Sequence, residues 1–230
     1  MSEEKELATL DDALIPADLD AETQAMLASP DASVVEAMEK AGTLILPYVI
    51  LGSGSSKHVA NKNVGVGEYG LVQGEKCENL GDEIDISVYA WQPKAMDTQG
   101  DVPIVTSDFN SQMFKDIKDR SRDSDSGCMW GWEFLVYLMD QHRFATFFMA
   151  SASARKEAPN LQALTGKCAR LTVVIAKNKK YTWPVTVSQP SDRLPDVPPT
   201  GDDLKDAATK FKQASKSDVE VVETGEERAR

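Results

Sequence analysis

The stretch CARLTVVIAKNKKYTWPVTVSQ, residues 168–189, decides the fold class of this chain. It holds two runs rich in β-branched and aromatic residues on either side of a basic Lys-Asn-Lys-Lys turn, a pattern that is typical of a β-hairpin. A second stretch, EIDISVYAWQ at residues 83–92, places Ile84, Ile86, Val88 and Ala90 on one face and Asp85, Ser87, Tyr89 and Trp91 on the other. Strict alternation of this kind predicts a strand that is buried on one side.

The neighbouring segments extend the β pattern. TLILPYVILG (43–52), EFLVYLMD (133–140) and RFATFFMAS (143–151) are expected to be strands, the last two joined by a tight turn at residues 140–142. Short helices are expected at 111–121, 154–166 and 202–215. We therefore predict a mostly β fold with short helices, of the α+β class. An OB-like Greek-key barrel with insertions fits this order, and a β-sandwich with helical additions fits nearly as well.

The chain divides into four segments by composition. Residues 1–28 are predicted to be a disordered acidic arm, and residues 29–42 a short helix with Ser29 as its N-cap and Gly42 at its end. Residues 43–189 form the β-rich OB-like domain. A cluster of prolines after Gln189 predicts that residues 190–230 are a proline-rich linker and a charged, flexible tail.

Composition excludes several classes of protein. No apolar run reaches the length of a membrane span, and the acidic start MSEEKELATLDD is unlike a secretory signal, so we expect a cytoplasmic protein, in the host cytoplasm if the chain is viral. Three widely spaced cysteines and two histidines do not form a zinc or redox motif. Nor do the acidic residues, or the glycine-rich GSGSSK at 52–57, have the spacing of a nuclease or phosphate-binding motif. We therefore expect a binding protein with no metal or cofactor, and not an enzyme.

The net charge of −12 is unevenly distributed. Residues 1–40 hold two lysines against eleven acidic residues, whereas residues 41–190 have no net charge. Within that body, residues 143–180 hold eight basic residues and one acidic residue, a local charge of +7. This basic region is the strongest electrostatic signal in the sequence.

Aromatic residues lie among these basic residues. Binders of single-stranded nucleic acid combine cations that follow the phosphates with flat rings on which unstacked bases lie. We accordingly predict a nucleic-acid-binding site made of Tyr89, Trp91, Lys94, Arg143, Arg155, Lys156, Lys177, Lys179, Lys180, Tyr181 and Trp183. Two simpler interpretations remain open: the phenylalanines of residues 143–151 are core residues, and the lysine-rich turn is an ordinary solvated turn. The segment SASARKEAP (151–159) is either an anion site or an ordinary helix start capped by Ser151 or Ser153.

Across residues 43–230 this layout resembles the single-stranded DNA-binding proteins of bacterial viruses, which have an OB-type body, basic and aromatic strands, and a charged C-terminal tail. The segments YAWQPKAMD (89–97), SGCMWGWEFLVYL (126–138) and RFATFFMASASARKEAPNL (143–161) are also similar to uncharacterised phage-encoded proteins. The resemblance implies sequence-independent binding of single-stranded DNA in phage replication or recombination.

The resemblance also implies partners. The acidic ends would contact replication or recombination proteins, and a homo-oligomer is compatible with the sequence. One departure concerns the tail, which ends GEERAR and lacks the hydrophobic end common in that group. The acidic N-terminal arm would then be the segment that competes with DNA. The alternative function is a phage structural or protein-interaction module that binds no nucleic acid.

Overall fold

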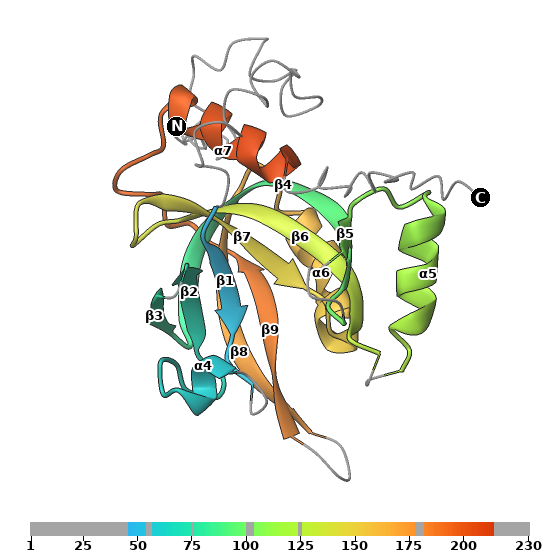
Figure 1. Cartoon of the computed structure of the whole chain (residues 1–230). Helices are drawn as coiled ribbons and strands as arrows, with labels where there is room; N and C mark the ends of the chain where they lie inside the picture. Colours follow the sequence, from blue (N-terminus) through green and yellow to red (C-terminus); the bar gives the residue numbers. More distant parts are fainter. Residues whose placement is uncertain are drawn as a thin grey trace, which may run out of the picture.

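The computed structural model describes residues 46–53, 57–74, 76–99, 104–123, 126–177 and 182–213 (Figure 1). The predicted helix at 29–42 and the acidic arm before it lie outside these residues. The elements along the chain are β1 (Tyr48–Leu51), α4 (Lys57–Ala60), β2 (Tyr69–Gln73), β3 (Lys76–Gly81), β4 (Glu83–Asp97), β5 (Ile104–Thr106), α5 (Gln112–Arg120), β6 (Cys128–Leu138), β7 (Arg143–Met149), α6 (Ala152–Gln162), β8 (Cys168–Lys177), β9 (Thr182–Pro190) and α7 (Gly201–Gln213).

The strands form one mixed sheet of nine strands that is not closed. Their order is β3-β2-β1-β7-β6-β4-β8-β9, and β5 pairs with the end of β4. Strands β1 and β7 are parallel over two residue pairs, and the other pairs of described strands are antiparallel. The expectation of a mostly β fold with short helices is confirmed; in the described sheet β3 and β9 end the main order and β5 pairs with β4 alone.

A β-bulge in β4 changes which face its side chains point to. Val88 pairs with Val136 and Ala90 pairs with Leu135, so Tyr89 is an extra residue without a partner in β6. Tyr89 and Ala90 both pack against the cluster under α7, whereas Trp91 contacts Trp132 on the opposite side. The prediction that Tyr89 and Trp91 share one face is therefore wrong, because an extra residue reverses the alternation of a strand.

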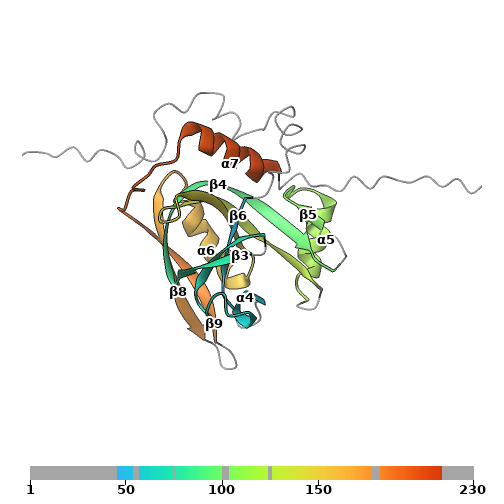
Figure 2. The same ribbon diagram turned by 60° about the vertical axis from the view of Figure 1, so that its left-hand side comes forward.

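Both faces of the central strands are buried, which explains the continuous apolar run in β6. Phe134, Val136 and Leu138 face a core that includes Ala158 and Leu161 of α6. Leu135 and Tyr137 alternate with them and pack under α7, against its Leu204 and Phe211. Figure 2 shows α7 lying across one end of the sheet, while α5 lies at the side, next to β5.

The packed body continues beyond the boundary expected at residue 190. Arg193 donates a hydrogen bond to the buried carboxylate of Asp85 at 3.0 Å, and the Tyr137 hydroxyl donates to the Val197 carbonyl at 2.8 Å. Thr200 and Asp203 cap α7 reciprocally through side chain and backbone. The segment predicted to be a linker thus ties α7 to the sheet. None of the helices in the described residues is long and apolar enough to cross a membrane.

Candidate nucleic-acid interface

Five aromatic rings gather on one side of β4 and β6, next to α5, and we call them the aromatic platform: Trp91, Phe109, Phe114, Trp130 and Trp132. Trp130 and Trp132 are two residues apart in β6 and so point to the same side. Trp91 meets Trp132 edge to face, with ring centroids 5.3 Å apart. The ring of Phe109 is nearly parallel to that of Trp132, at 13° and 6.5 Å.

Two cations lie against these rings. The Lys118 ammonium of α5 is 4.7 Å from the Trp130 ring and 5.3 Å from the Phe109 ring. The Arg155 guanidinium of α6 is 4.5 Å from Trp130, and it donates hydrogen bonds to the carbonyls of Trp130 and Ala150. Burial lowers the pKa of Arg155, although an arginine remains charged at neutral pH. Two basic side chains thus lie against the Trp130 ring, and one of them also lies against Phe109.

Two rings of the platform are open to solvent. Trp91 is 43% exposed and Phe109 is also 43% exposed, whereas Phe114 of α5 is buried against Ala95 and Cys128 of the sheet. Exposed aromatic rings beside cations are the chemical requirement for stacking an unpaired base next to its phosphate. The arrangement offers flat apolar surface and positive charge within one contiguous area.

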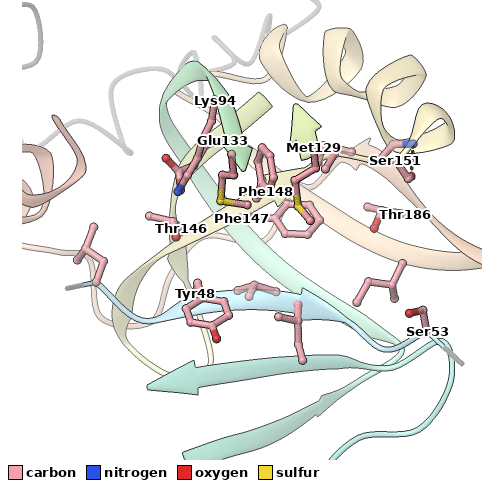
Figure 3. Close-up of a pocket in the computed structure, with 18 of the residues that line it drawn as sticks. Tyr48, Ser53, Lys94, Met129, Glu133, Thr146, Phe147, Phe148, Ser151 and Thr186 are labelled. Atoms are coloured by element: carbon pink, nitrogen blue, oxygen red, sulfur yellow. Dashed lines mark hydrogen bonds and ion pairs between the residues drawn. The ribbon is translucent and has the colours of Figure 1, made fainter. Parts of the chain in front are cut away.

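A second feature is a pocket of about 1040 Å³ on the other side of β4 and β6, which we call the β7 pocket (Figure 3). Its walls come from β1, β4, β6, β7, the start of β9, the first turn of α6 and the end of α7. They are mostly apolar: Val49, Leu51, Met96, Met129, Phe147, Phe148, Met149 and Val185. Leu46 and Gln213, the first and last described residues, both line it.

Lys94 and Glu133, which line the β7 pocket, belong to one hydrogen-bonded network. Lys94 donates to Glu133 at 2.5 Å, and the side-chain amide of Gln92 donates to the other carboxylate oxygen at 3.0 Å. The Lys94 ammonium is also 5.7 Å from the Phe148 ring. Glu133 is buried, and a buried carboxylate needs both a counter-charge and hydrogen-bond donors. Lys94 supplies the positive charge and Gln92 supplies a second donor.

The predicted site residues do not form one groove. Trp91 and Arg155 both belong to the platform region, and Lys94 belongs to the pocket. Tyr89 packs against Phe144 in the core, where burial raises the pKa of its hydroxyl. Tyr89 is therefore not an exposed stacking ring, because the bulge turns it under α7.

The remaining predicted residues are dispersed. Arg143 is exposed and donates to Gln73 of β2, and Lys156 is exposed on α6. Lys177 is exposed at the end of β8, and Trp183 of β9 is half-buried opposite Ala176. Lys179, Lys180 and Tyr181 lie outside the described residues. The start of α6 is an ordinary cap, in which the Ser151 hydroxyl accepts from the Ala154 amide.

Several residues of both surfaces were not predicted. Trp130 and Trp132 could have been predicted from the sequence, because a Trp-x-Trp spacing in a strand puts both rings on one face. No sequence pattern indicates Phe109 and Lys118, since they reach the platform only through the packing of α5 against β4 and β6. Glu133 is hidden for a similar reason: its partner Lys94 comes from another strand.

No protein-family model matches the chain, and neither curated proteins nor solved structures give a significant match.

Proposed function

We propose that this protein binds single-stranded DNA without sequence preference, and that the aromatic platform is where the strand makes its main contact. The observation that carries the proposal is the pair of exposed rings, Trp91 and Phe109, on the same platform as Trp130, with the Lys118 ammonium against Phe109 and Trp130 and the Arg155 guanidinium against Trp130. Stacking of a base on an aromatic ring contributes about 1–3 kcal/mol and is available to every base. Two such rings give useful affinity without reading the sequence.

The order of the strands supports an OB-like arrangement. β4, β6 and β7 are consecutive antiparallel neighbours, and β8 returns to the other side of β4, which is the order of a Greek key. With β9 as the fifth strand, the connection between the first two strands is residues 98–127. In OB folds this connection and the one between strands four and five contact oligonucleotides.

Both of those connections carry suitable chemistry. The first contains Phe109 and Lys118, which complete the aromatic platform. The second joins β8 to β9 in the sequence and contains Lys179, Lys180 and Tyr181, which lie outside the described residues. The acidic balance of the whole chain does not oppose binding, because residues 1–40 carry most of the excess acid and the body is neutral.

Fluorescence anisotropy with a labelled dT20 oligonucleotide tests the proposal. Titrations at a series of salt concentrations should give an affinity that falls steeply with salt, because binding releases counterions from the phosphates. A duplex of the same length is the control, and it should bind more weakly because its bases are already stacked. Absence of binding to dT20 at low salt would reject the proposal and leave a protein-interaction module as the better interpretation.

A further inference from the structure

The β7 pocket exposes apolar surface that the proposed DNA contact does not use. Its volume is about 1040 Å³, and in Figure 3 Tyr48 of β1 lies across the cavity from Met129 and Phe148. Tyr48 is 40% exposed and Met129 is 37% exposed, while Phe148 is half-buried. Contiguous exposed apolar surface on a folded protein marks a place where another group binds. The pocket is therefore a candidate docking site.

Both ends of the described body lie at this pocket. Leu46, the first described residue, and Gln213, the last, are part of its wall. The chain that precedes Leu46 therefore joins the body at the edge of the cavity. Leu44 and Ile45, which come immediately before it, are apolar like the walls of the pocket. The N-terminal segment is thus the part of the chain best placed to fill the cavity.

The side chain of Gln213 indicates the chemistry of a suitable occupant. Its amide nitrogen and oxygen are both buried, and neither has a hydrogen-bond partner among the described residues. Buried polar groups without partners are costly and uncommon. A backbone peptide group, with one N–H donor and one carbonyl acceptor, can satisfy both atoms of a side-chain amide. A polypeptide with apolar side chains therefore suits the pocket better than a hydrocarbon ligand, which has no group for this amide.

The segment that precedes the body has a matching apolar face. Residues 29–42 are predicted to form a helix, and their apolar side chains recur at the spacing of one helix face: Val34, Val35, Met38 and Ala41. The charged side chain of Glu36 belongs to the opposite face of such a helix. A short amphipathic helix gains most of its stability by packing its apolar face on another apolar surface.

The pocket is within reach of that face. Residues 43–45 join the predicted helix to Leu46 at the edge of the cavity, and an extended chain spans about 3.3 Å per residue, which lets the helix turn back onto the pocket. We propose that the β7 pocket is the docking site of residues 29–45 of the same chain, with the apolar face of the helix against Met129 and Phe148. The contact requires no nucleic acid, so this inference does not rest on the proposed function.

Photo-cross-linking of the full-length protein, without DNA, tests the docking. The cross-linking amino acid p-benzoylphenylalanine replaces Met38 in one variant and Glu36, on the opposite helix face, in a matched variant. Irradiation of the first should give a product of monomer size whose cross-links map by mass spectrometry to Met96, Met129 or Phe148, and the second should give severalfold less. Equal yields from the two positions, or no cross-link to the pocket, would overturn the inference. Covalent dimers would show that a second copy fills the pocket and would also overturn it.

A pair of glutamate substitutions in the protein that carries the cross-linker at position 38 locates the contact on the body. Met129→Glu places a charge in the wall of the pocket, and the yield at the other wall residues should fall severalfold, because a docked apolar face would bury an unpaired carboxylate. Met113→Glu makes the same change at a 41% exposed position of α5 outside the pocket, and the yield should be kept. An unchanged yield in Met129→Glu, or an equal loss in both variants, would overturn the assignment.

Discussion

The aromatic platform and the β7 pocket lie on opposite sides of the same two strands and differ in chemistry. The platform is open, with Trp91 and Phe109 each 43% exposed and two cations against its rings. The pocket is lined mainly by methionine, phenylalanine and aliphatic side chains, and its buried Glu133 is bonded to Lys94 and Gln92. One surface exposes aromatic rings, and the other is an apolar cavity with a buried ion pair in its wall.

This contrast shows how one pair of strands supports two kinds of contact. Side chains alternate across a sheet, so consecutive residues such as Met129 and Trp130 serve different surfaces. Affinity would come mainly from the platform, since stacking does not depend on the sequence of the strand.

The largest expected effect is on the stability of the sheet that contains both surfaces. Asp85 is buried in β4 and binds Arg170 at 2.9 Å and Arg193 at 3.0 Å. Asp85→Ala should lower the free energy of unfolding by about 3 kcal/mol, the lower end for a broken buried ion pair, because both arginines are partly exposed. Urea unfolding measures this loss. A change below about 0.5 kcal/mol, the size usual for a surface site, would contradict the role of Asp85.

The same residue predicts a dependence on pH. Burial alone would raise the pKa of Asp85, but the guanidinium groups of Arg170 and Arg193 outweigh it and hold the pKa below its usual value. The stabilisation is therefore present above the pKa of an unfolded aspartate, near 3.9, and is lost as the pH falls from there toward the folded value. Urea unfolding at a series of acidic pH values measures this. The free energy of unfolding should fall less steeply with decreasing pH in Asp85→Asn than in the unmodified protein.

A smaller effect separates the two surfaces. Trp91→Ala should weaken dT20 binding about tenfold, within the 1–3 kcal/mol of one stacked base, because it removes an exposed ring of the platform. Val66→Ala is the control, since Val66 is 55% exposed in a loop that belongs to neither surface. Fluorescence anisotropy measures the affinity of each variant for dT20. A folded Trp91→Ala protein with unchanged affinity would remove the platform from the binding site.

The smallest expected effect comes from the acidic arm. Deleting residues 1–40 removes a net charge of −9, and Leu46, close to it in sequence, lines the β7 pocket. Binding of dT20 should become severalfold tighter at low salt, and the gain should disappear at high salt, where exposed charges are screened. Equal affinities of the two proteins at low salt would show that the arm does not compete with the strand.

The sequence predicted the elements better than the site. Three predicted helices and the hairpin of 168–189 are confirmed as elements, because their patterns are local, although the helix predicted at 154–166 begins at Ala152 and already ends at Gln162. The prediction of the site was wrong at Tyr89. A β-bulge there, which no residue type indicates, reverses the alternation of side chains along β4. It was also incomplete, since Phe109 and Lys118 come to the platform through the packing of α5. Periodicity predicts which residues share a face only while the register holds.

Quenching of intrinsic tryptophan fluorescence tests the central claim most directly, because Trp91, Trp130 and Trp132, three of the four tryptophans, lie in the platform. Addition of dT20 should quench the emission of the unmodified protein. In Trp91→Phe most of that quenching should be lost, and in Trp183→Phe most of it should remain. Binding that produces no quenching, or a larger loss in Trp183→Phe than in Trp91→Phe, would contradict the account.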